Sequence, residues 1–208
     1  MKLDVNNLLK LKDLTQDVLD KYFQDLEEHK QKWIDPFSSE LKRWKKQDIF
    51  IETGTATGAS IQAALDAGFS HVYSIELNPY FCLAAQEYFK DYPVTIISGS
   101  SHIELPKLLK TDGVSSQAIF LWLDAHFSGG PHVGDNMISY LPFEIETLKR
   151  SEVDFSNISI LIDDFDHMEK QGLDAFIEES KQSLKLLKPH CEPELYKSAT
   201  GHTFMKAL

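Results

Sequence analysis

Three acidic residues in the second half of the chain could together hold a divalent cation. Asp124 directly follows a run of apolar residues, and the pair Asp163 and Asp164 follows another such run. Carboxylates that met in one place would repel one another unless a cation lay between them. Because oxygen-only ligands suit Mg²⁺, Mn²⁺ or Ca²⁺, the three aspartates predict a site for such an ion. The alternative is structural: Asp164 caps the next helix, and Asp163 binds loop amides.

A glycine-containing segment earlier in the chain predicts a ligand-binding loop. Gly54 allows a tight turn, and Gly58 allows the next helix to pack closely. The dinucleotide fingerprint does not fit, because alanines stand at positions 56 and 59, and no Gly-Lys-Ser/Thr of a phosphate loop follows. The acidic Glu52 before the loop suits a ligand with a cationic or hydrogen-bond-donating end. The alternative is a plain turn between a strand and a helix.

Glu76 indicates what this ligand contains. It lies 22 residues beyond Gly54, at the end of the next apolar run. An acidic side chain in that place can accept hydrogen bonds from both hydroxyls of a ribose. A solvated acidic strand end is the alternative for Glu76 alone. Together, the loop and Glu76 predict a ligand that includes a nucleoside.

His126, two residues after Asp124, is a candidate general base. Histidine can exchange a proton near neutral pH, so His126 could deprotonate a substrate hydroxyl or serve as a fourth metal ligand. The alternative is that it only orients its loop. Residues 127–141, which are rich in glycine and proline, predict a long loop of the kind that often covers an active site.

Short apolar runs must position these residues. They are rich in β-branched and aromatic side chains and alternate with helix-length stretches, which predicts a parallel sheet buried on both faces. Ligands bind at the carboxyl ends of such strands, and the candidate site residues described above stand at those ends. Residues 195–208 predict a final antiparallel hairpin. The five runs are 49–51, 71–75, 94–97, 118–123 and 158–162.

Residues 1–47 predict an N-terminal helical appendage, because leucines and other apolar residues recur at spacings of mostly three and four. Pro36 is expected to interrupt this pattern, with Ser38 or Ser39 capping a second short helix that runs through Trp44. We favour a cover packed on the domain over a lid or a dimer arm, because such helices usually bury their apolar stripe.

Residues 48–165 resemble a class I S-adenosylmethionine-dependent methyltransferase. The segment 50–58 matches the family's first motif, and 73–78 matches its acidic second motif. The resemblance implies that Glu52 and the backbone of 54–58 hold the methionine portion, that Glu76 binds the ribose, and that Leu77 lies beside the adenine. It also implies that Ser100 or Ser101 meets the adenine amino group. The expected cofactor contacts are Glu52, Thr53, Gly54, Thr55, Ala56, Gly58, Glu76, Leu77, Ser100, Ser101 and Asp124.

The acidic residues are similar to those of the metal-dependent O-methyltransferases of catechol, caffeoyl-CoA and macrolide-sugar type. That resemblance implies Mg²⁺ bound by Asp124, Asp163 and Asp164. This chain departs from the pattern after the fourth strand, where Ala125 and His126 stand in place of a second acid or a lysine.

Composition limits the partners. The 208 residues carry a net charge of −11, which argues against nucleic acid, since a phosphate backbone needs a basic face. No apolar run approaches the ~18 residues of a membrane span, so no membrane partner is expected.

Cys82 and Cys191 cannot form a disulfide framework or a four-thiolate zinc site. Free thiols and the lack of a secretory leader predict a cytoplasmic protein.

We therefore expect an α/β fold: a Rossmann-like three-layer sandwich with a mostly parallel seven-stranded sheet over residues 48–208. The expected function is methyl transfer from S-adenosylmethionine to a small-molecule acceptor, at an oxygen, with His126 and Asp124 as catalytic residues and Mg²⁺ as a helper. Rival functions are a nucleoside-binding module without activity, an NAD-dependent oxidoreductase, which Ala56 disfavours, and a metal-dependent hydrolase. A homodimer is the partner expected if the first helices form a dimer arm.

Overall fold

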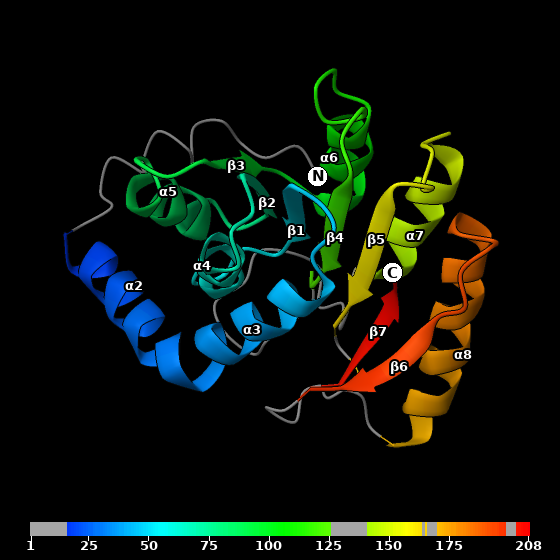
Figure 1. Cartoon of the computed structure of the whole chain (residues 1–208). Helices are drawn as coiled ribbons and strands as arrows, with labels where there is room; N and C mark the ends of the chain where they lie inside the picture. The colour runs from blue at the N-terminus through cyan, green and yellow to red at the C-terminus, as the bar shows by residue number, and fades with distance from the viewer. Residues whose placement is uncertain (1–15, 126–140, 164, 166–169, 199–202) are drawn as a thin grey trace.

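The computed structural model describes residues 16–125, 141–163, 165, 170–198 and 203–208 (Figure 1). One seven-stranded sheet runs through the molecule in the order β3-β2-β1-β4-β5-β7-β6. The first five strands pair in parallel, and β7 pairs antiparallel with β5 and β6. The predicted parallel sheet and final hairpin are therefore confirmed. The strands are β1 (Ile49–Thr53), β2 (His71–Glu76), β3 (Val94–Ser98), β4 (Ile119–Leu123), β5 (Ile158–Ile162), β6 (Glu194–Lys197) and β7 (Thr203–Ala207).

Helices cover both faces of the sheet and form the two outer layers of the predicted three-layer sandwich. Alternating residues of each inner strand point to opposite faces, so Phe50 packs with one buried cluster and Ile51 with the other. One face carries α6 (Ser101–Leu109), α7 (Leu141–Arg150) and α8 (Lys170–Leu187). The other carries α2 (Gln16–His29), η2 (Lys30–Ile34), α3 (Asp35–Trp44), α4 (Ala59–Asp66) and α5 (Pro79–Tyr88).

The N-terminal helices form one bent rod along α4 (Figure 1). The helix is interrupted near Pro36 as expected: α2 gives way to the π-helical η2, and a second short helix, α3, runs through Trp44 with Pro36 in its first turn, where a missing N–H costs nothing. Ser38 and Ser39 do not cap this helix: Ser38 is buried within it, and the Ser39 hydroxyl donates to the Asp35 carbonyl oxygen at 3.0 Å. The rod buries apolar side chains against the sheet and α4, namely Leu26, Ile34, Phe37, Leu41 and Trp44.

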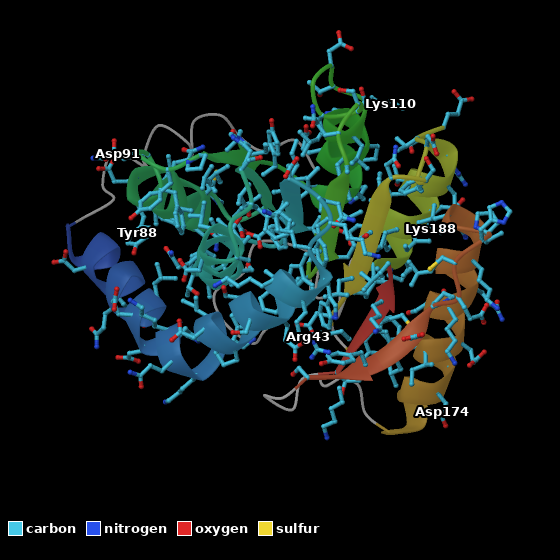
Figure 2. The ribbon with its side chains drawn as sticks, in the orientation of Figure 1. Arg43, Tyr88, Asp91, Lys110, Asp174 and Lys188 are labelled. Atoms are coloured by element: carbon cyan, nitrogen blue, oxygen red, sulfur yellow. The ribbon has the colours of Figure 1, made fainter. Side chains whose placement is uncertain are left out.

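The strand order reverses between β1 and β4, and ligands of open α/β sheets bind in the crevice outside the strand ends at such a point. Figure 2 shows charged side chains such as Asp91 and Asp174 at the outer edge of the molecule, while apolar side chains fill the space between sheet and helices. Within the described ranges, no helix is long and apolar enough to cross a membrane.

Candidate functional site

The loop between β1 and α4 has a backbone that requires glycine at its start. Gly54 has φ 86° and Gly58 has φ 78°, both in the left-handed region. A Cβ atom on Gly54 would lie 2.6 Å from the carbonyl oxygen of Asp124, at the end of β4. The loop therefore packs directly on the chain that leaves β4. Ala56, with φ 44°, adopts a left-handed conformation despite its side chain.

Glu76, the last residue of β2, holds this loop by hydrogen bonds. Its Oε2 accepts the backbone N–H groups of Thr55 at 2.9 Å and Ala56 at 3.0 Å, and its Oε1 accepts that of Asn78 at 2.6 Å. Burial raises the pKa of Glu76, and these backbone hydrogen bonds oppose the rise. A carboxylate has roughly four acceptor positions, so a ligand diol would share them with the loop.

Glu52 lies behind the loop and is fully buried. Its Oε1 accepts the Ser74 hydroxyl at 2.6 Å, and the Ser74 and Thr55 hydroxyl oxygens lie 2.5 Å apart. Its Oε2 makes no hydrogen bond of regular geometry with the residues that the structure describes. Burial raises the pKa of Glu52 to about 8; the hydroxyls of Ser60 and Ser74 oppose the rise, and the charges of Asp124 and Glu76 add to it. At neutral pH Glu52 therefore carries a proton until a ligand changes its surroundings.

Two of the predicted metal ligands stand at adjacent strand ends. Asp124 follows β4, and its backbone N–H donates to the Thr53 hydroxyl at 3.2 Å. Asp163 follows β5, is buried, and donates its backbone N–H to the Leu123 carbonyl oxygen at 3.1 Å. The indole N–H of Trp122 donates to Asp124 Oδ2 at 3.1 Å.

The remaining candidates of this set lie outside the described residues. They are Asp164, His126 and most of the predicted loop at 127–141. In the described part of the chain, no group of three or more His, Cys, Asp or Glu residues could hold a metal ion. The three-aspartate site and the base His126 therefore stay predictions.

The end of β3 supplies the predicted adenine contacts. Ser100 precedes α6, and its hydroxyl lies 2.9 Å from Nδ1 of His102. The His102 ring centroid is 6.0 Å from that of Phe143, a half-exposed residue of α7. Ser101 is buried in the first turn of α6, and Leu77 is half-buried beside Glu76. These positions bring Ser100 and Leu77 to the same edge of the sheet as Glu76.

Sequence reasoning missed the roles of three residues at this edge. Asn78 caps α5 by accepting the Tyr80 N–H at 2.9 Å, and the Asn-Pro pair at 78–79 was its signal. Trp122 could have been found from its spacing, since residues two apart on a strand share a face. For His102, whose contact with Phe143 joins two helices, the sequence holds no local signal.

Comparison with family models and with curated proteins finds no match. Solved structures do match. The SAH-bound methyltransferase PaMTH1 of Podospora anserina superposes with a TM-score of 0.56 at 13% identity, over 100% of this chain and 98% of that one. The O-methyltransferase of Bacillus cereus in complex with SAH gives 0.56 at 13% identity, over 96% and 94%. TomG of Streptomyces achromogenes, an O-methyltransferase in complex with SAM that is involved in tomaymycin synthesis, gives 0.53 at 13% identity, over 96% and 94%.

The chain has the fold of these methyltransferases. The predicted Rossmann-like methyltransferase fold is thereby confirmed along nearly the whole length of both chains. At 13% identity the likeness is one of fold, so conclusions about chemistry depend on the residues at the strand ends.

Proposed function

We propose that this protein transfers a methyl group from S-adenosylmethionine to an oxygen of a small-molecule acceptor. The observation that carries the proposal is the bond between Glu76 and the loop amides of Thr55 and Ala56, beside the buried Glu52. This arrangement stands where the strand order reverses, in a fold shared with structures that contain SAM or SAH.

The residues present fit this cofactor. The buried Oε2 of Glu52, which makes no hydrogen bond of regular geometry within the described residues, suits the ammonium group of the methionine portion. Glu76 would accept the ribose hydroxyls, with Leu77 beside the adenine. Ser100 or Ser101 would meet the adenine amino group. Gly54 and Gly58 give the loop the left-handed turns that it needs to pack on the chain leaving β4.

The work of the protein in this reaction is alignment. When bound, S-adenosylmethionine supplies an electrophilic methyl group on a sulfonium. The loop at 54–58, with Glu52 and Asp124 beside it, would hold that end of the cofactor so that an acceptor oxygen could approach in line. His126 would take the proton that the acceptor hydroxyl loses.

A divalent cation is a further part of the proposal. Asp124 and Asp163 stand at neighbouring strand ends, and Asp164 follows Asp163 in the sequence. This oxygen donor set fits Mg²⁺. Bound there, Mg²⁺ would lower the pKa of an acceptor hydroxyl.

The net charge bears on the class of acceptor. A net charge of −11 favours a small molecule over nucleic acid. A cytoplasmic location, a domain border near residue 47 and a homodimer through the first helices accompany the proposal as further expectations.

Calorimetric titration with S-adenosylmethionine and with SAH, each with and without Mg²⁺, tests the proposal. We expect micromolar binding of both, lost in Glu76→Ala, and a change in affinity when Mg²⁺ is added. Absence of binding by either nucleoside would refute the cofactor. Tight binding of NAD instead would favour an oxidoreductase. Metal binding that needs no nucleoside would favour a hydrolase, and nucleoside binding without turnover on any hydroxylated acceptor would favour a binding module.

A further inference from the structure

A tryptophan inside the sheet bonds to one of the candidate site carboxylates. Trp122 is fully buried near the end of β4, and its register partner on β1 is Glu52. A buried indole N–H needs an acceptor, and Trp122 Nε1 donates to Asp124 Oδ2 at 3.1 Å. The two residues lie two positions apart on the extended chain, so their side chains share a face.

The Trp122 ring is fixed by aromatic neighbours from distant parts of the chain. Its centroid lies 4.8 Å from that of Phe37 on α3 and 5.2 Å from that of Phe204 on β7. Phe37 is itself 4.6 Å from Trp33 of η2. The ring cannot turn without displacing side chains of the N-terminal rod or of the last strand, because protein interiors are close-packed.

The backbone of Asp124 is held as well. Its N–H donates to the Thr53 hydroxyl at 3.2 Å, and its carbonyl oxygen lies against Gly54. The indole thus fixes the side chain of a residue whose main chain is already fixed to the glycine loop. Without the indole, Asp124 Oδ2 would lose one of the groups that orient its carboxylate.

We infer that Trp122 is a positioning residue, whose indole N–H orients the carboxylate of Asp124, a residue whose backbone packs on the loop at 54–58. Phe37 and Phe204 hold the indole, which gives the N-terminal rod a part in arranging the site. The inference rests on the proposed function only for what Asp124 contacts; the bond itself can be tested without any ligand.

The first experiment tests the bond in the full chain. Protein labelled with ¹⁵N in its tryptophans gives indole N–H signals for Trp33, Trp44 and Trp122, assigned through single Trp→Phe variants. Asp124→Ala should shift the Trp122 signal and leave the other two in place. Asp124→Asn retains an acceptor oxygen and should shift it less. An unchanged Trp122 signal in both variants would overturn the inference, whatever the protein binds.

The second experiment tests the consequence with SAH as the probe. Trp122→Phe keeps an aromatic ring but removes the donor, and we expect about a 10-fold loss of SAH affinity, the lower end of what a hydrogen bond to a charged group contributes. Trp33→Phe is the matched control: it also alters the aromatic cluster but removes no bond to Asp124, and its affinity should stay within about twofold of wild type.

The two experiments separate the possible failures. If wild type does not bind SAH, the proposed function fails, and the indole signals alone decide the bond. If wild type and Trp122→Phe bind SAH equally well, the positioning role is overturned. The melting temperatures of Trp122→Phe and Trp33→Phe show whether a loss of SAH affinity comes with a loss of stability. If both melting temperatures fall by a similar amount and only Trp122→Phe loses affinity, the positioning role is supported.

Discussion

Glu52→Gln should make the protein more stable in alkaline solution. The pKa of Glu52 is raised by burial from its ordinary 4.5 to about 8, so the folded protein keeps a proton that the unfolded chain releases above about pH 4.5. The unfolding free energy of wild type therefore falls as pH rises from 4.5 to 8 and does not recover above that. At ~1.36 kcal/mol for each pKa unit, the loss attributable to this group is at most about 5 kcal/mol.

Glutamine is neutral at every pH and keeps the oxygen that accepts the Ser74 hydroxyl. The variant should match wild type near pH 5 and exceed it in stability increasingly up to pH 9. Urea unfolding followed by circular dichroism at pH 5, 6.5, 8 and 9 measures the difference, in which the titration of all other groups cancels. Glu87→Gln, at an exposed position, is the control and should run parallel to wild type. Parallel curves for Glu52→Gln as well would refute the reasoning.

Three further predictions concern ligand binding. Glu76→Ala leaves two loop N–H groups without their acceptor, so it should lower the unfolding free energy by about 1–3 kcal/mol and abolish SAH binding. Glu76→Gln should retain most of the stability. Denaturation and calorimetry on both variants check this. Gly54→Ala places a Cβ 2.6 Å from a carbonyl oxygen at φ 86°, so SAH affinity should fall about 10-fold or more, and unchanged affinity would contradict the geometry of the loop. Asp124→Asn combined with Asp163→Asn should abolish any effect of Mg²⁺ on affinity or turnover, and an effect that survives both changes would remove the metal from these residues.

The sheet could be predicted because each inner strand is a short apolar run with a sharp end. The runs at 71–75 and 158–162 agree with β2 and β5 to within a residue, since burial on both faces favours apolar side chains along a strand, even though Ser74 and Ser159 are buried among them. A second short helix near Pro36 could be predicted because proline disrupts a continuous helix but is accepted in a first helical turn. Its cap could not, since α3 directly follows η2 and its N-cap residue, Ile34, makes no side-chain cap hydrogen bond.

The residues of the site could be predicted more easily than their interactions. Glu76 was expected to face a ligand, but it also holds the amides of Thr55 and Ala56, which lie about twenty positions away in the chain. Such a bond depends on how β1 and β2 pair and on the turn at Gly54. The raised pKa of Glu52 likewise arises from burial by residues of several elements, which no local pattern contains.

The charges of the site favour a cationic ligand over an anionic one. The hydrogen bonds to Glu52 and Glu76 come from neutral donors, namely hydroxyl groups and backbone amides. Neutral donors orient a carboxylate without cancelling its charge, so Glu76 still gains from a nearby positive group, and a positive group beside Glu52 would favour release of its proton. The sulfonium and ammonium groups of S-adenosylmethionine provide that charge. The pyrophosphate of a dinucleotide would meet repulsion from the same acids, which disfavours NAD on grounds independent of the glycine spacing.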